Sequence, residues 1–257
     1  MSQELTPPAL ALLGACVFLA GAIDALAGGG GLITLPAYMA SGLSPALILG
    51  TNKLSSSVGT VVATARYHRA LKFSLKEFIP VLVATALAAW LGARLAVRVD
   101  PKWLRPLMLV VLPLVSWLVW SRKDFGQEDR SRRLPLRERR LREILVSAPV
   151  GAYDGFFGPG AGTFYALGLT RACDFDLLGA TARAKALNLL SNLGALFAFA
   201  IAGRVNWRVG VPMAAAGVAG NWAGAHLGVR RGAAVIRPAV VLVCAGLFAK
   251  LLFDALR

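Results

Sequence analysis

The chain has 257 residues, of which 57% are hydrophobic and 16% are charged, and its formal net charge is +15. Soluble domains average about a quarter charged residues, so this composition excludes an ordinary water-soluble globular protein. The positive charge lies mainly in short segments between apolar windows and has few aromatic residues beside it, which argues against nucleic-acid binding. We therefore expect a polytopic membrane protein.

Long windows of low charge recur along the whole chain. A helix needs about 20 apolar residues to cross the hydrocarbon core, so the sequence predicts an all-α protein with about eight transmembrane helices. The first window could imitate a signal peptide, but no Lys or Arg precedes it and Asp24 interrupts it, so we expect an uncleaved span. The windows are 8–27, 43–64, 78–98, 103–121, 144–168, 177–202, 207–229 and 233–254.

Two of these windows contain a glycine cluster that follows an aspartate. Residues 21–38 read GAIDALAGGGGLITLPAY, and residues 151–167 read GAYDGFFGPGAGTFYAL. A membrane helix can break only where protein or a watery cavity satisfies its backbone, and the free N–H groups of the following helix suit an anion. Tight helix packing is the structural alternative for such glycines. The predicted anion-binding residues here are Gly29, Gly30, Gly31, Thr34, Gly158, Gly160, Gly162 and Thr163.

The next segment of each half carries a lysine with polar neighbours, in GTNKLSSSVGT (50–60) and TARAKALNLLSNLG (181–194). Charges inside spans are rare and usually functional or paired, although a lysine near a span end can also extend to the interface. Cations with hydroxyl and amide donors suit a small oxyanion. The predicted substrate-binding residues are Thr51, Asn52, Lys53, Ser56, Arg183, Lys185, Asn188, Ser191 and Asn192; Lys185, Asn188 and Asn192 share one helix face.

Asp24 and Asp154 are predicted to be coupling or gating residues. A carboxylate beside an anion repels it, so we do not expect either aspartate to contact the anion directly. Proton uptake at these carboxyls would link transport to protons. The alternative is that each aspartate caps the helix after its break or pairs with the lysine of its own half.

An internal repeat divides the chain into two homologous four-span halves. Asp24 corresponds to Asp154 at an offset of 130, and Lys53 corresponds to Lys185 at an offset of 132. The halves are residues 1–121 and 144–257, joined by a basic linker, 122–143, with nine Arg or Lys and five Asp or Glu. Transporters are often built this way, with the substrate site between the repeats. Four spans per half give parallel repeats, whereas Gly-rich hairpins that return to their starting side allow inverted ones.

The distribution of basic residues predicts the orientation in the membrane. Basic short loops mark the cytoplasmic side, so we expect a cytoplasmic linker that attracts anionic lipid. Residues 66–76 lie two spans before the linker, and Arg204 and Arg208 lie two spans after it, which predicts the same side for all of them and an inside position for both termini.

The sequence contains no recognisable catalytic or cofactor site. Cys16, Cys173 and Cys244 show no paired spacing, so neither a disulfide nor a metal site is expected. The two histidines, His68 and His226, form no Ser-His-Asp arrangement, and neither glycine cluster has the ending of a nucleotide-binding loop.

At the quoted motifs the chain resembles the TauE/SafE family, the sulfite exporter or DUF81-type membrane permeases. The resemblance rests on GAIDALAGGGGLITLP with GTNKLSSSVGT, on GAYDGFFGPGAGTF with ARAKALNLLSN, and extends from about residue 10 to 253. It implies a secondary carrier with about eight spans, linked to sulfite, sulfoacetate and related organosulfur compounds. Arg183 departs from the family pattern, which leaves the substrate open.

Together these features predict an inner-membrane secondary transporter of a small anion, with two halves that alternate access around a midplane site. A cation or metal transporter with the aspartates as ligands, and a membrane-embedded enzyme acting on a lipid or acyl group, are the two alternatives. The expected partners are a small anionic substrate and membrane lipid. The direction of transport and the oligomeric state, a homodimer included, are left open.

Overall fold

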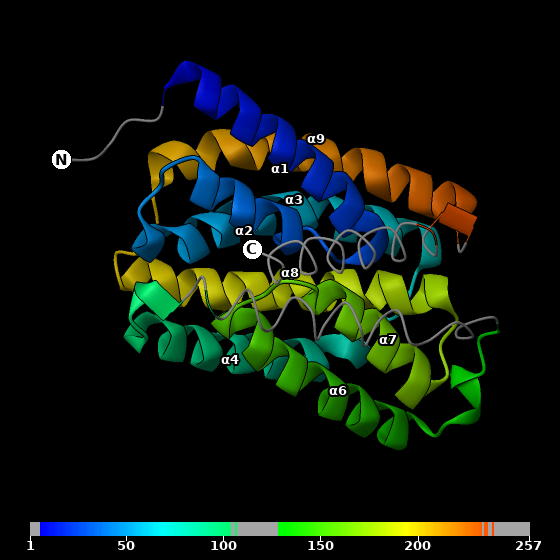
Figure 1. Cartoon of the computed structure of the whole chain (residues 1–257). Helices are drawn as coiled ribbons and strands as arrows, with labels where there is room; N and C mark the ends of the chain where they lie inside the picture. Colours follow the sequence, from blue (N-terminus) through cyan, green and yellow to red (C-terminus); the bar gives the residue numbers. More distant parts are fainter. Residues whose placement is uncertain (1–5, 104–105, 107–127, 233, 236–237, 239–257) are drawn as a thin grey trace.

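The computed structural model describes residues 6–103, 106, 128–232, 234–235 and 238 (Figure 1). Within these ranges the chain forms α-helices and two short 3-10 helices, and it forms no strand. The helices are α1 (Pro7–Ala27), α2 (Gly31–Ala40), α3 (Pro45–Leu71), α4 (Leu75–Arg98), η1 (Pro101–Trp103), η2 (Ser131–Arg133), α6 (Leu136–Phe156), α7 (Ala161–Cys173), α8 (Leu177–Ile201) and α9 (Trp207–Arg231).

Helices α1, α4 and α8 are each long and apolar enough to span a membrane. Helices α3 and α9 have similar lengths of 27 and 25 residues, but buried polar side chains lower the mean hydropathy of α3. The expected span 144–168 is divided between α6 and α7. The expected spans 103–121 and 233–254 lie almost entirely outside the described residues.

The outer surface of the bundle is apolar, as expected for a protein in contact with lipid. Along α4, large side chains every four residues are 51–58% exposed, while the opposite face of the helix is buried. A surface helix of a water-soluble protein would instead carry polar or charged residues on its exposed face. The exposed row consists of Ile79, Val83, Leu87, Leu91 and Leu95.

Both glycine clusters interrupt a helix and reverse its direction, as predicted for the break itself. In Figure 1, α2 returns toward the end at which α1 begins, and α7 returns toward the start of α6. Leu13 of α1 shares a buried cluster with Leu35 and Tyr38 of α2. Arg142 near the start of α6 donates a 3.0 Å hydrogen bond to the carbonyl of Ala172 at the end of α7. Each pair is therefore a re-entrant hairpin.

The hairpins determine which connections lie at each end of the bundle. One end, called here the basic end, holds residues 66–77, 129–143, 171–183 and 226–231. It is fixed by a 3.1 Å ion pair between Arg139 and Glu77 and by Arg183, which lies over the ring of Phe73. The opposite end holds the start of α1 and the turns around residues 41–44 and 202–206 (Figure 1).

The prediction that Arg204 and Arg208 lie on the same side as the linker is wrong. Arg204 lies at the opposite end, where its carbonyl packs against Gly50. The prediction counted α6 and α7 as one full crossing, whereas the pair returns to its starting end. The same reversal at α1 and α2 places the start of α1 at the end opposite the linker. With a cytoplasmic linker, the start of α1 lies on the outside, so the predicted inside position of the N-terminus is wrong.

Helices from the two sequence halves are interleaved. Helix α1 packs along α9, and α6 packs along α4, while α3 and α8 pack on each other in the centre. Gly224 lies against the carbonyl of Ala22, and Gly92 lies against the carbonyl of Ala152. A side chain at either glycine would collide with the backbone, so both crossings depend on glycine.

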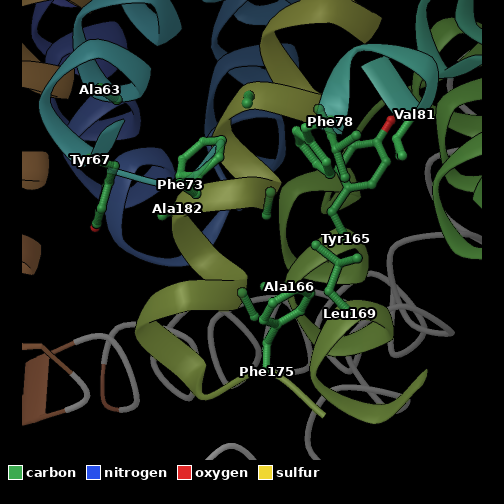
Figure 2. Close-up of a cluster of buried hydrophobic side chains, with 14 of the residues drawn as sticks. Ala63, Tyr67, Phe73, Phe78, Val81, Tyr165, Ala166, Leu169, Phe175 and Ala182 are labelled. Carbon is green, nitrogen blue, oxygen red and sulfur yellow. The ribbon is translucent and has the colours of Figure 1, made fainter. Parts of the chain in front are cut away.

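An aromatic cluster closes the basic end of the bundle (Figure 2). Phe73 and Phe78 stack edge-to-face with ring centroids 5.8 Å apart, and buried Tyr165 and Phe175 extend the cluster to α7 and α8. This packing fixes the start of α8, from which Lys185 extends.

Candidate functional site

The two helix breaks lie against each other in the middle of the bundle. Gly28 and Gly162 are in backbone contact, and a Cβ on Gly31 would lie 3.2 Å from the Cα of Pro159. Gly28 ends α1 with a φ of 75°, and Gly160 precedes α7 with a φ of 77°; glycine adopts this left-handed conformation without strain. The glycine motifs thus bring both interruptions to one place.

Asp24 and Asp154 differ in their contacts with the helices that follow the two breaks. Asp24 accepts a 3.3 Å hydrogen bond from the amide of Gly30 at the start of α2, so its carboxylate caps that helix. Asp154 has no described hydrogen bond to the start of α7. The capping alternative therefore fits Asp24 and does not fit Asp154.

The four buried charges form two ion pairs that cross between the sequence halves. The ammonium of Lys53 lies 2.7 Å from Oδ1 of Asp154, and that of Lys185 lies 3.0 Å from Oδ2 of Asp24. The alternative in which each aspartate pairs with the lysine of its own half is wrong. The interleaved packing places α3 beside the second break and α8 beside the first.

The Lys53–Asp154 pair is buried, and both of its side chains are hydrogen-bonded to polar neighbours. Its side chains are 3% and 2% exposed. Asp154 Oδ2 accepts hydrogen bonds from Asn188, at 3.1 Å, and from Ser191, and Lys53 donates to Asn192 at 2.8 Å. A buried charge is tolerated only when it is paired and hydrogen-bonded, and this pair meets both conditions.

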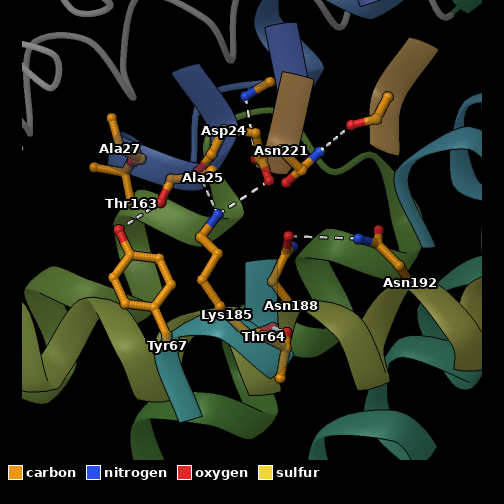
Figure 3. A network of polar contacts seen from close by, with 12 residues as sticks. Asp24, Ala25, Ala27, Thr64, Tyr67, Thr163, Lys185, Asn188, Asn192 and Asn221 are labelled. Carbon is orange, nitrogen blue, oxygen red and sulfur yellow. Dashed lines mark hydrogen bonds and ion pairs between the residues drawn. The ribbon is translucent and has the colours of Figure 1, made fainter. Parts of the chain in front are cut away.

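Asp24 of the Lys185–Asp24 pair lines a pocket, and Figure 3 shows the polar contacts around this pair. Lys185 is 1% exposed, whereas Asp24 is 16% exposed, and Lys185 also donates to the backbone carbonyl of Asp24. Asn221 of α9 lies beside Asp24, is 3% exposed, and donates through Nδ2 to the carbonyl of Gly217 at 3.0 Å. Its Oδ1 is buried and has no hydrogen-bond partner among the described residues. The pocket is lined by Asp24, Gly30, Thr34, Ser55, Ser56 and Asn221, with apolar neighbours.

The remaining predicted site residues are distributed over a wider region. Thr34 donates to Asn52 at 2.6 Å, next to the pocket, and Thr163 donates to the carbonyl of Ala27 beside the first break. Thr51 instead accepts from the amide of Asn206 near the opposite end. Arg183 lies at the basic end, with its guanidinium 3.9 Å from the ring centroid of Phe175. The structure therefore does not bring Thr51 and Arg183 together with the crossed pairs.

Asn221 is the functional candidate that the sequence analysis missed. It stands in the segment GNWAG, where only the neighbouring Trp222 and Gly224 matched the first half. The signal that could have identified it is an amide inside an apolar span, at the position where the first half has Ala89. No group of three or more His, Cys, Asp or Glu that could hold a metal occurs within the described ranges.

Lipid-facing helices, two re-entrant hairpins and ion pairs buried at the helix breaks define a polytopic membrane protein of the transporter class. The family model "Sulfite exporter TauE/SafE" matches residues 13–251. The chain therefore belongs to the TauE/SafE family of membrane transporters.

Proteins similar to this chain are also named as probable membrane transporters. The chain is 39% identical over 254 residues to "Probable membrane transporter protein YfcA" of Escherichia coli strain K12, covering 98% of this chain and 92% of that protein. It is 37% identical over 253 residues to "Probable membrane transporter protein ORF9" of a Sinorhizobium species, covering 98% and 95%. It is 36% identical over 246 residues to a "Probable membrane transporter protein" of Haemophilus influenzae, covering 95% of each chain. No solved structure matches the chain significantly.

Proposed function

We propose that the protein is a secondary transporter of a small anion, sulfite or an organosulfonate. The observation that carries this proposal is the pair of crossed Lys–Asp contacts at the meeting point of the two breaks. A lysine in such a position can exchange its carboxylate partner for an anionic substrate. The sulfur chemistry of the substrate comes from the family, and the transporter names of the relatives support a role other than catalysis.

The proposed architecture is two inverted repeats. Each helix of the first half runs opposite to its counterpart in the second half: α1 to α6, α2 to α7, α3 to α8 and α4 to α9 (Figure 1). The contact of α1 with α9 likewise has its counterpart in the contact of α6 with α4. The repeats correspond to residues 1–121 and 144–257, with α6 already beginning inside the linker 122–143. Inverted repeats of this kind support alternating access, because exchanging the two conformations moves the opening from one side to the other.

The substrate site is proposed to lie between the breaks. It includes the lysines and their hydroxyl and amide neighbours, with Asp24 and Asp154 as the coupling or gating groups. An anion that approaches an intact ion pair meets no net charge, so binding requires that a carboxylate move away or take up a proton. This exchange would connect substrate binding with rearrangement of the two halves, which the crossed pairs hold together.

The proposed location is the cell (inner) membrane, with the basic end in the cytoplasm. Arg66, Arg69, Lys72, Arg139 and Arg230 are among the many cations at that end, as the positive-inside rule requires. In a cysteine-free background, a cysteine in place of Arg69 should react with an external impermeant maleimide in inside-out vesicles, which expose the cytoplasmic face, and not in right-side-out vesicles. A cysteine in place of Arg204 should react from the opposite side, and labelling of both from one side would contradict this orientation.

Uptake into proteoliposomes tests the substrate class. The purified protein should accumulate labelled sulfite or sulfoacetate above protein-free liposomes and should not accumulate rubidium as a control cation. The double variant Lys53→Ala/Lys185→Ala, checked for folding by size-exclusion chromatography, should lose anion uptake. Accumulation of the cation without either anion would contradict the proposal and favour a cation transporter.

A further inference from the structure

The two crossed pairs differ in their capacity to accept a proton. Both oxygens of Asp154 accept hydrogen bonds from Lys53, Asn188 and Ser191, and the side chain is 2% exposed. The Lys53 ammonium and the Asn188 amide can only donate to that carboxylate, and the Ser191 hydroxyl lies within hydrogen-bond distance of both Asp154 and the carbonyl of Asn188. Asp154 is therefore suited to remain ionised.

Asp24 has an acceptor beside it. Asn221 lines the same pocket as Asp24 and donates through Nδ2 to the carbonyl of Gly217, while its buried Oδ1 has no donor among the described residues. Figure 3 shows Asn221 next to the Asp24 carboxylate. A buried acceptor without a donor has lost the hydrogen bonds that water would give it, and two facing oxygen acceptors repel each other unless a proton lies between them.

The equivalent position in the first half is closed. Asn221 corresponds to Ala89 at the offset of 132 that relates the lysines. Ala89 is fully buried, and its backbone lies against Gly155, directly after Asp154. The position equivalent to Asn221 therefore supplies no side-chain acceptor to the Asp154 pair.

We infer that Asp24 binds the proton that accompanies the anion, and that Asn221 Oδ1 accepts the hydrogen bond of the protonated carboxyl, whereas Asp154 stays ionised. One proton from solvent forms one O–H bond on Asp24, and Lys185 keeps its own proton. The Asp24–Lys185 site then changes from neutral to a single positive charge, which an anion can neutralise. The role given to this proton rests on the proposed anion transport.

The groups that face Asp24 are consistent with a single titrating carboxyl. Lys185 from α8 is the only charged partner described. Tyr67 from α3 donates to the carbonyl of Ala25, and Thr163 from α7 donates to that of Ala27. Gly30 from α2 supplies a backbone amide, and α9 supplies the neutral Asn221.

Infrared difference spectroscopy between acidic and neutral pH tests the inference on the purified protein without any substrate. Wild type should show the C=O band of a buried carboxylic acid. Asp24→Asn should lose this band, whereas the matched control Asp154→Asn should retain it. Asn221→Leu, which keeps the size of the side chain but removes the acceptor, should shift the frequency of the band. Circular dichroism and size-exclusion chromatography check the fold of each variant.

Absence of the band in wild type, its survival in Asp24→Asn, or its loss in Asp154→Asn would overturn the inference. An unshifted band in Asn221→Leu would overturn the role given to Asn221. Because no anion is present, a failure of the uptake experiment leaves this result unaffected, and a negative infrared result leaves anion uptake open to its own test.

Discussion

The Lys53–Asp154 pair and the Lys185–Asp24 pair have the same chemistry at equivalent sequence positions but different surroundings. The first is buried, with Asn188 and Ser191 donating to its carboxylate and Asn192 accepting from its ammonium. The second borders a pocket that Asn221 also lines, and the buried Oδ1 of Asn221 has no hydrogen-bond partner among the described residues. Equivalent positions in a repeat can therefore have different roles: we propose that one pair holds the halves together and that the other binds the proton.

The largest expected effect is on stability, at the Lys53–Asp154 pair. Lys53→Met leaves Asp154 charged and buried, which should lower the free energy of unfolding by about 3–5 kcal/mol. Lys185→Met should lower it less, because Asp24 retains access to the pocket and the amide of Gly30. Apparent melting temperatures in detergent measure both.

The double variant Lys53→Met/Asp154→Leu serves as the control, because an apolar pair of similar volume removes the unpaired charge and should restore much of the stability. Equal losses in Lys53→Met and Lys185→Met would contradict the distinction between the pairs.

A second effect concerns the helix crossings that hold each pair in place. Gly92→Val and Gly224→Val insert side chains against the carbonyls of Ala152 and Ala22, and each should destabilise the protein by about 1–3 kcal/mol or more. Gly14→Ala is the matched control, because its new methyl group would meet only the side-chain end of Met213 at 3.8 Å. A tolerated valine at one crossing alone would show that the two crossings are not equivalent.

Variants of the two pairs should differ in how a proton gradient affects their rate of anion transport. An imposed gradient should stimulate anion uptake in proteoliposomes by about fivefold or more if proton and anion binding are coupled. Asp24→Asn preserves shape and capping but not the titratable charge, so the stimulation should disappear. Asp154→Asn should lower the rate but keep the stimulation. If Asp24→Asn retains the wild-type dependence on the gradient, capping of α2 is the better account of this residue.

The smallest effect is expected at an exposed pair outside the membrane helices. The Lys102 backbone amide and ammonium hold the pKa of Asp100 below its ordinary value. A lowered pKa favours the folded state above the ordinary carboxyl pKa, and this contribution is lost as the pH falls through the lowered one. Because Asp100 is in water, Asp100→Asn should leave the melting temperature unchanged at neutral pH. A clear loss would contradict the view that burial distinguishes the important pairs.

Local chemistry allowed part of this arrangement to be predicted from the sequence. Glycine and proline in GGGG and GPGAG predicted both helix breaks, because no other residues interrupt a membrane helix so readily. The shared face of Lys185, Asn188 and Asn192 was also predicted from helical spacing, and the two asparagines are in contact at 3.4 Å.

The partners of these residues could not be predicted, because they depend on how helices from the two halves pack against each other. Lys185 reaches Asp24, whereas Asn188 reaches Asp154 and Asn192 reaches Lys53. One face of α8 thus serves both pairs, because it lies between the two breaks. The predicted side of Arg204 was wrong for a related reason. Each hairpin returns to the side from which it started, so the loops that follow it lie on the opposite side from the one that a full crossing would give.

The contact of Gly224 with Ala22 also constrains the order in which the protein can be made. Helix α1 leaves the ribosome before its packing partner α9, which follows only after some 180 residues of further chain. Until α9 arrives, the small-residue face of α1 and the carboxylate of Asp24 have no native cover on that side. The first half can therefore enter the membrane early but can complete its fold only when synthesis of the second half is nearly finished.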